Sequence, residues 1–238
     1  MDILDLDSNI AYNLYVQQNK AVFTDIDKTI FPNGSLNLLV QNFYKKKLLP
    51  IRLIFLVLYW YGLYKMNWIN DFSKVIEKCN KVLNPMLTRN NVKELDALMK
   101  KWFDAEITPK IYPEIEQRIR KLHSDGHKVY FVSSTIDPVA RLFRDYFGFG
   151  EIEATTLEQK DGFYTSYIQG TPCHGEEKVK RMKRLAKEEN IDLEQSYSFT
   201  DHISDLPMLK IVGHPIVVNP KRLLKVIAKK NRWQILKL

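Results

Sequence analysis

The chain has 238 residues, of which 45% are hydrophobic and 27% charged, and it carries a formal net charge of +8 at pH 7. These values are typical of a soluble globular protein and exclude a chain too short to bury a core, so one domain, or one domain with an insertion, is expected. The positive charge favours anionic partners such as phosphorylated metabolites, anionic lipids or nucleic acids, although solvated lysine faces make many proteins basic.

Cysteine usage and the first residues indicate the compartment. Cys79 and Cys173 have no metal-ligand spacing and define no disulfide framework, which favours a reducing environment. The segment Met1–Asp7 is acidic where a secretory signal would be basic, so export is not expected. We therefore predict a cytoplasmic protein.

The first predicted strand is the apolar run Ala21–Thr24, which is followed directly by Asp25, Asp27 and Thr29. A short apolar run of this kind is typical of a buried parallel strand. Open α/β sheets bind ligands at the carboxyl ends of such strands. Two carboxylates one residue apart, followed by a hydroxyl, can divide a phosphoryl transfer between a nucleophile and an acid/base.

The next stretch, roughly residues 36–108, contains no convincing strand and predicts helices. The expected helices are Leu36–Lys46, Ile51–Lys65, Trp68–Lys81 and Asn91–Phe103. Because this stretch follows the first strand, we expect an insertion that covers the carboxyl edge of the sheet.

One of these helices raises the question of a membrane. The segment Leu53–Tyr64 has no charged residue and follows the basic run Lys45–Lys47. It is shorter than the ~20 residues that a spanning helix needs, and a run of this length is usually a buried or an interfacial helix. Its aromatic end and basic flank also suit a helix in a membrane interface, with contact through residues 48–68. Both interpretations stay open.

After the insertion, strands and helices alternate. The expected elements are a helix over Glu114–Ser124, a strand over Lys128–Val132, a helix over Pro138–Phe147, short strands over Glu151–Thr156 and Gly162–Ile168 around the Asp161-Gly162 turn, a helix over Glu176–Glu189, strands over Ser196–Phe199 and Ile216–Val218, and a basic helix over Lys221–Lys230. This alternation predicts a mostly parallel sheet with right-handed crossovers and helices on both faces.

Three further segments place polar residues at equivalent points of this pattern. The strand Val129–Val132 ends in Ser133, and a helix that opens at Gly175 carries Lys178 in its first turn. The strand Ser196–Phe199 leads into Asp201 and Asp205. Each puts a polar group where a parallel strand stops or a helix starts, so we expect these groups to meet Asp25 at one edge of the sheet.

The order carboxylate pair, hydroxyl, lysine, carboxylate pair resembles the haloacid dehalogenase (HAD) superfamily of phosphohydrolases, and most closely its branch related to phosphoserine phosphatase. The segments Gly162–Thr165, Cys173–Val179 and Asp205–Pro220 are also similar to that branch. The resemblance covers about residues 20–32 and 110–232. It implies a Rossmann-like core over residues 1–32 and 110–238, with a helical cap domain inserted over residues 33–109.

The resemblance also implies a Mg²⁺-dependent phosphomonoester hydrolase. In such an enzyme Asp25 is the nucleophile that becomes an aspartyl phosphate, Asp27 is the general acid/base, and Lys178 steadies Asp25 and the transferring oxygens. The implied metal ligands are Asp25, the backbone carbonyl of Asp27, and Asp201, with Asp205 in the outer shell or acting through water. The implied phosphate-binding groups are Thr29, Ser133, Ser134 and Lys178.

Each of these residues also has a structural interpretation. Asp25 and Asp27 would suit a turn after a strand, and Ser133 could cap the following helix in competition with Ser134, Thr135 and Asp137. Lys178 could be a solvated helix lysine, and Asp201 and Asp205 could cap the helix before Leu206-Pro207. For His202 the favoured interpretation is an exposed loop histidine.

Some positions depart from the common form of the superfamily. Lys28 stands where glycine is frequent, Thr24 where an aromatic residue often precedes the nucleophile, and His202 where a small residue is usual. None of these changes removes a catalytic group, and Lys28 and His202 are placed to narrow the site or to contact substrate.

The substrate is inferred from the insertion. The ammonium group of phosphoserine needs a carboxylate, and the segment Ile30–Leu36 has none, which argues against that substrate. The apolar and aromatic surface with a basic edge favours a lipid phosphate such as phosphatidylglycerophosphate or lysophosphatidate. A soluble metabolite (phosphoserine, a polyol phosphate or histidinol phosphate) is the alternative.

A protein of another class would be a basic module that binds an anionic membrane or nucleic acid without turnover. The sequence contains no RNP, helix-turn-helix or zinc-finger signature, so no nucleic-acid partner is expected. The set Asp25, Asp27, Lys178 and Asp201 also favours an enzyme over a binding module.

Overall fold

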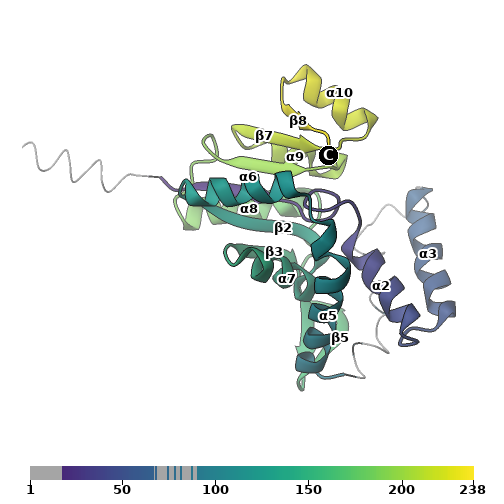
Figure 1. Ribbon diagram of the computed structural model, residues 1–238. Helices are drawn as coiled ribbons and strands as arrows, with labels where there is room; N and C mark the ends of the chain where they lie inside the picture. The colour runs from purple at the N-terminus through teal and green to yellow at the C-terminus, as the bar shows by residue number, and fades with distance from the viewer. Residues whose placement is uncertain are drawn as a thin grey trace, which may run out of the picture.

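The structure is a computed structural model that describes residues 18–66, 68, 74, 78, 81, 87 and 90–238 (Figure 1). Its strands are β1 (Lys20–Thr24), β2 (His127–Ile136), β3 (Glu151–Thr155), β4 (Leu157–Lys160), β5 (Phe163–Ile168), β6 (Tyr197–Thr200), β7 (His214–Val218) and β8 (Gln234–Leu236). Its helices are α2 (Ser35–Lys45), α3 (Ile51–Lys65), α5 (Val92–Glu106), α6 (Pro113–Ser124), α7 (Asp137–Phe147), α8 (Glu176–Glu188), α9 (Leu206–Lys210) and α10 (Arg222–Lys230). Short 3₁₀ turns, η1 (Thr108–Lys110) and η2 (Ile203–Asp205), complete the described elements.

The core is a six-stranded sheet in the order β3-β2-β1-β6-β7-β8, and each neighbouring pair is parallel. The neighbouring strands β1 and β2 are buried on both faces. Val22 and Phe131 belong to one hydrophobic cluster, while Phe23 and Tyr130 belong to another. This alternation of apolar side chains between two buried faces is the pattern of a parallel sheet covered on both sides. The predicted α/β fold is confirmed.

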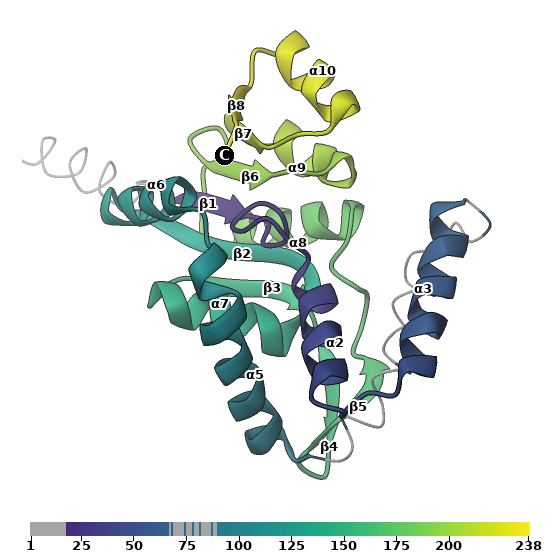
Figure 2. The same cartoon turned by 45° about the vertical axis from the view of Figure 1, so that its right-hand side comes forward.

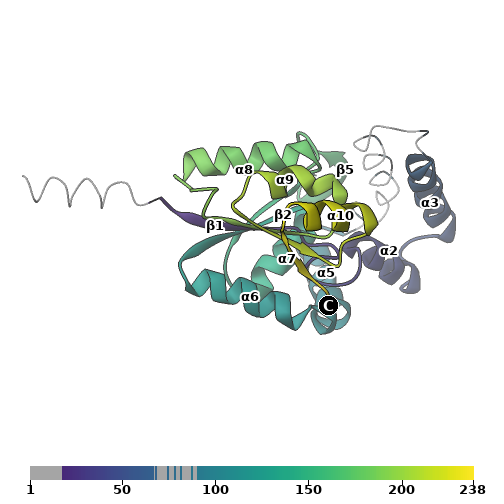
Figure 3. The ribbon, with the colours of Figure 1, turned by 90° about the horizontal axis from the view of Figure 1, so that it is seen from above.

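Helices cover both faces of the sheet, as Figure 3 shows. Apolar residues of α6 and α7 share a cluster with one face, and those of α8 and α9 share a cluster with the other. The helix α10 packs on α9 and β7 through Leu224 and Ala228. Because β1, β2 and β6 are parallel neighbours, their carboxyl ends meet at one edge of the sheet.

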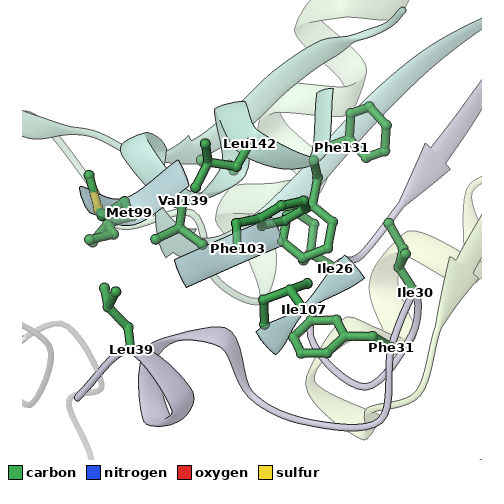
Figure 4. Close-up of a cluster of buried hydrophobic side chains, with 14 of the residues drawn as sticks. Ile26, Ile30, Phe31, Leu39, Met99, Phe103, Ile107, Phe131, Val139 and Leu142 are labelled. Carbon is green, nitrogen blue, oxygen red and sulfur yellow. The ribbon is translucent and has the colours of Figure 1, made fainter. Parts of the chain in front are cut away.

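The chain leaves this edge after β1, forms α2 and α3, and returns through α5. Figure 2 shows α2 and α5 side by side next to the sheet, with α3 standing further out. Figure 4 shows how α2 and α5 are held: Leu39 of α2 and Phe103 of α5 lie in one apolar cluster with Val139 of α7 and Ile26. The division into a core over residues 1–32 and 110–238 and a cap over residues 33–109 remains a prediction.

The prediction for the segment after α7 was wrong in its strand pairing. Glu151–Thr155 does not face the Asp161-Gly162 turn but joins the large sheet beside β2, and the partner of β5 is β4. Asp161 (φ 53°) and Gly162 (φ 81°) both have left-handed backbone conformations, which a two-residue hairpin turn requires. Such a turn pairs the residues immediately before Asp161, and these are mostly polar and exposed, so they carry no strand pattern.

Two smaller differences concern strand ends. The strand β2 continues beyond Ser133 to Ile136, and the edge strand β8 was not predicted at all. Three other predictions, the acidic segment Met1–Asp7, Cys79 and most of the helix Trp68–Lys81, lie outside the described residues. Among the helices that the structure describes, none combines the length and the apolar composition needed to cross a membrane.

The close approach of two backbone segments at Gly213 generates a stability prediction. A Cβ at Gly213 would lie 1.7 Å from the backbone oxygen of Glu194, and backbone on both sides cannot give way cheaply. We expect Gly213→Ala to lower the free energy of unfolding by about 3 kcal/mol or more, measured by urea denaturation. Gly62→Ala is the control, because a Cβ there meets nothing within 4 Å in helix α3. Gly62→Ala should leave the free energy of unfolding unchanged or raise it by up to about 1 kcal/mol. Equal effects of the two changes would contradict the prediction.

Candidate functional site

The site begins at the residue that follows β1. The N–H of Asp25 donates to the backbone oxygen of Phe199 at 2.9 Å, so this residue continues the pairing of β1 with β6. In the register of the sheet, Thr24 of β1 lies opposite Phe131 of β2 and Phe199 of β6. Asp25, Ser133 and Asp201 follow these three positions by one or two residues. Sheet pairing therefore brings all three to one edge, as the sequence predicted.

Lys178 occupies the centre of the site. Its Nζ donates to Asp25 Oδ1 at 2.7 Å and to Asp205 Oδ2 at 2.8 Å, and its side chain is 2% exposed. The lysine reaches this position because α8 begins directly after Gly175, whose φ of 55° favours glycine. Burial alone would lower the pKa of Lys178, but Asp205 and Asp25 raise it above its ordinary value, so the ammonium stays charged. The interpretation as a solvated lysine was wrong.

Asp205 is the fixed counter-ion of this lysine. Its Oδ2 also accepts from Thr200 Oγ1 at 2.9 Å, and its Oδ1 accepts from Ser204 Oγ at 3.3 Å. Burial raises the pKa of Asp205, but Lys178 and Thr200 outweigh that effect and lower it below the ordinary value. Asp205 lies at the N-cap position of α9 but makes no side-chain cap there, so its contacts are with the site.

For Asp25 and Asp201, nearby positive charge offsets less of the cost of burying the carboxylate. Burial raises the pKa of Asp25 well above its ordinary value, against the opposing charge of Lys178, and the neighbouring Asp205 and Asp27 raise it further. Burial raises the pKa of Asp201 to about 6, although the charge of Lys28 opposes the shift. Negative charge at this edge therefore exceeds the positive charge that the protein supplies, and a further cation would balance it.

The donor set fits Mg²⁺. Asp25 Oδ2 has a single long contact, 3.4 Å from Thr29 Oγ1, and the Asp201 carboxylate makes no hydrogen bond to another side chain in the described part of the protein. Oxygen donors of this kind are what Mg²⁺ prefers, usually one or two carboxylates with waters and substrate phosphate. Over the described residues, no group of three or more His, Cys, Asp or Glu side chains is arranged to hold a metal.

Asp27 lies two residues beyond Asp25 and is half buried. Its Oδ1 accepts from the backbone N–H of Ser35 at 2.9 Å. Burial raises the pKa of Asp27, and the hydrogen bonds from Ser35 oppose the shift. Lys28, which directly follows Asp27, has a φ of 61°. This left-handed backbone conformation suits glycine and costs a lysine about 1 kcal/mol or more.

The predicted phosphate-binding hydroxyls differ in their surroundings. Thr29 is buried against Asp25, and Ser133 is 1% exposed with its Oγ accepting from the Thr135 N–H at 3.3 Å. Ser133 does not cap α7, whose N-cap position is Ile136, so that alternative was wrong. Ser134 is half buried, and its carbonyl accepts from Thr155 of β3. No hydrogen bond links the Ser134 side chain with these carboxylates in the described ranges.

His202 behaves as the favoured interpretation predicted. It is exposed, and its Nδ1 accepts from the Ser204 N–H at 3.2 Å, which caps η2. Partial burial of the ring lowers the pKa of His202; the charge of Asp205 opposes this shift, and the nearby lysines Lys221 and Lys28 add to it.

Three residues of the site were not among those predicted for it from the sequence. Thr200 bonds Asp205, and Ser35 and Thr135 form a buried hydroxyl pair 2.9 Å apart beside Asp27. Thr200 carried a usable signal, because it is the last residue of a strand that ends at the site. The signal for Ser35 was absent, since a serine that begins a helix is ordinarily a surface cap.

Comparison with known proteins agrees with this geometry. The family model for haloacid dehalogenase-like hydrolases matches residues 22–210. A probable phosphatase of Mycobacterium tuberculosis is 29% identical over 220 residues, which is 91% of this chain and 74% of the relative. A histidinol-phosphatase of Neisseria meningitidis is 32% identical over 158 residues, or 63% of this chain and 69% of the relative.

Solved structures share the fold. A Bordetella pertussis protein of unknown function has a TM-score of 0.80 at 23% identity, covering 92% of this chain and 99% of its own. Phosphoserine phosphatases are among the other solved structures with this architecture.

The Lys178 contacts generate a second prediction. Lys178→Met leaves two buried carboxylates facing each other without a cation, and we expect it to lower the free energy of unfolding by about 3–5 kcal/mol. The control is Lys180→Met on the same helix, because the Lys180 side chain is 75% exposed and its ion pair with Glu177 is 3.5 Å long. That change should cost less than about 1 kcal/mol. Thermal and urea denaturation of the two variants measure the difference, and similar losses would contradict the assignment of Lys178 as a buried counter-ion.

Proposed function

The chain belongs to the haloacid dehalogenase-like hydrolase family and is a phosphatase, and we propose that it hydrolyses phosphate monoesters through a phosphorylated Asp25. The observation that carries the proposal is the buried Lys178, which joins Asp25 to Asp205 where β1 and β6 end. Asp25 and Asp205 share this one buried lysine but have pKa values shifted in opposite directions, and the half-buried Asp27 lies nearby. Such an arrangement is typical of a catalytic site rather than of a purely structural ion pair.

Asp25 is the proposed nucleophile. Lys178 holds one of its oxygens and leaves Oδ2 with only the long Thr29 contact, so lone pairs remain free to attack phosphorus. The attack forms the Asp25–phosphorus bond and breaks the bond to the leaving oxygen. Lys178, Thr29 and Ser133 offer an ammonium and two hydroxyls to the oxygens of the transferring group, where charge gathers.

Asp27 is the proposed general acid and base. Its raised pKa favours the protonated form that gives a proton to the departing alcohol oxygen. The resulting carboxylate takes a proton from water as that water attacks the Asp25 phosphate, so phosphate leaves and both aspartates return to their starting states. This splits one slow displacement into two faster ones.

Mg²⁺ is the proposed cofactor, held by Asp25, Asp201 and the Asp27 carbonyl. When bound it would neutralise charge on the phosphate dianion and polarise its oxygens. The support is the excess of buried carboxylates over cations at this edge and the open acceptors of Asp25 and Asp201. Asp205 keeps Lys178 in place. Its Oδ2 accepts from Lys178 and Thr200 and its Oδ1 accepts from Ser204, so both oxygens already have donors.

The first test is Asp25→Asn. We expect phosphate release from simple monoesters to need Mg²⁺, to stop on addition of EDTA, and to fall by about 10⁴-fold or more in the variant, because the covalent route is lost. Wild-type turnover is measured by free phosphate, and fold is checked by circular dichroism. Activity that survives in folded Asp25→Asn would refute the assigned nucleophile.

The proposed substrate is a small phosphate monoester without an ammonium group. One relative named for histidinol phosphate and two named for phosphoserine support a small soluble substrate, although both of those compounds carry an amine, so the absence of an ammonium group is argued from this chain alone. Within this chain, residues 28–70 contain no aspartate or glutamate, and their charged residues are Lys28, Lys45, Lys46, Lys47, Arg52 and Lys65. This segment leads from Asp27 into α2 and α3, so it offers an ammonium group no counter-ion, whereas a polyol phosphate needs none.

A lipid phosphate is the second candidate, favoured by the outer face of α3. Large apolar side chains recur along it, with Ile51, Phe55, Leu58 and Tyr59 each at least half exposed. Leu53 and Ile54, on the other side, pack against the main cluster. The core-helix interpretation therefore holds for one side of α3 only, and the basic run Lys45–Lys47 beside it is exposed. An exposed apolar face with basic neighbours suits an anionic lipid surface.

These two candidates make different predictions for the double change Phe55→Ser, Leu58→Ser. For the soluble substrate, we expect kcat/KM on glycerol phosphate to change by less than about twofold, because both side chains are exposed. The matched control is Leu223→Ser, Val226→Ser on the basic helix α10, whose side chains are 61% and 59% exposed. Loss of activity on vesicle-bound lysophosphatidate in the α3 variant alone would favour the lipid candidate instead.

A further inference from the structure

Ser35, the first residue of α2, is fully buried and bonded on two sides. Its backbone N–H donates to Asp27 Oδ1 at 2.9 Å, and its Oγ lies 2.9 Å from Thr135 Oγ1. Asp27 belongs to the loop after β1, and Thr135 lies near the end of β2. One residue of the insertion therefore touches both strands' carboxyl ends.

The contact with Asp27 satisfies a need of the helix. The first N–H groups of a helix have no partner within it, and the N-cap residue of α2, Gly34, has no side chain to accept them. The carboxylate of Asp27 supplies the acceptor from elsewhere in the chain. The start of α2 and the carboxyl group of Asp27 thus hold each other in place.

The geometry leaves the second oxygen of Asp27 open. Asp27 Oδ2 has no hydrogen-bond partner among the residues that the structure describes, and a Cβ at Gly34 would lie 3.8 Å from it. With Oδ1 held by Ser35, Oδ2 is the oxygen free to carry a proton toward a leaving group.

The hydroxyl of Ser35 extends this arrangement to the phosphate-binding side. Thr135, its partner, is 4% exposed, and the Thr135 N–H donates to Ser133 Oγ at 3.3 Å. A continuous set of contacts thus runs from Asp27 through Ser35 and Thr135 to Ser133.

We propose that Ser35 is a positioning residue that holds Asp27 with Oδ2 toward the leaving oxygen and ties α2 to the segment carrying Ser133. The inference rests on the proposed function, because it takes Asp27 as the acid. It adds that the acid is held in place by the insertion, so protonation of the leaving group depends on where α2 lies.

The test compares Ser35→Pro with Ser35→Ala. Proline has no N–H and is well suited to the first position of a helix, and Gly34 (φ −85°, ψ 124°) already has the extended conformation that precedes proline. Ser35→Pro therefore removes both contacts. Ser35→Ala removes only the hydroxyl, so the difference between the two variants measures the N–H contact with Asp27.

The readout is kcat/KM for an alkyl phosphate and for 4-nitrophenyl phosphate. The value of kcat/KM reports the steps up to departure of the leaving group. Nitrophenolate can depart without being protonated, whereas an alkoxide needs a proton. Because general acid catalysis contributes about 10²–10⁴-fold, we expect Ser35→Pro to lose at least about 10-fold on the alkyl phosphate and under about 3-fold on the aryl phosphate. Ser35→Ala should lose less than Ser35→Pro on the alkyl phosphate.

Equal losses on both substrates, or none, in folded Ser35→Pro would overturn the inference. If Ser35→Pro fails to fold, Thr135→Val takes its place, because it removes the partner hydroxyl without altering α2. The same selective loss, smaller in size, is expected there, and an equal loss on both substrates overturns the inference. A wild-type protein that releases phosphate from neither substrate would overturn the proposed function itself, whereas normal wild-type turnover with unselective variants overturns only the role of Ser35.

Discussion

The balance of buried charge at one sheet edge is the constraint on which the site depends. Parallel strands end there together, and their carboxyl ends deliver Asp25 and Asp201 into surroundings that water barely reaches. The buried ammonium of Lys178 forms ion pairs with both Asp25 and Asp205, so its single positive charge is shared between two carboxylates. A site with surplus negative charge is unstable by itself but attracts a hard cation and, through it, a phosphate dianion. Burial raises the pKa of Asp25 and Asp201, whereas Lys178 lowers that of Asp205, so the aspartates have unequal proton affinities.

The sequence was sufficient wherever one segment carries its own signal. Runs such as Ala21–Thr24 and Val129–Val132 are apolar because both faces of the sheet are covered, and the polar residues after them mark where the strands end. The order of these polar residues was enough to place Asp25, Lys178 and Asp201 at one site before any contact was known. The parallel sheet and its helices followed from the same alternation.

Features that a segment's own pattern of residues does not show could not be predicted from the sequence. The strand β4 is polar, and only its pairing with β5 across the Asp161-Gly162 turn makes it a strand. Ser35 and Thr135 are 100 residues apart, and neither has a pattern around it that indicates the other. The exposed side of α3 belongs to the same class, since an apolar run of that length is typical both of a core helix and of an interfacial one.

The shared apolar cluster of Figure 4 has a consequence for how the molecule unfolds. Leu39 and Phe103, from the insertion, are packed into the same cluster as Val139 of α7 and Ile26 of the loop after β1. Neither part keeps a complete hydrophobic core when the other is removed. Melting should therefore be a single cooperative transition for α2, α5 and the sheet, with α3 the part that opens at lower cost because much of its surface already faces solvent. An excised insertion would not be a small folded protein.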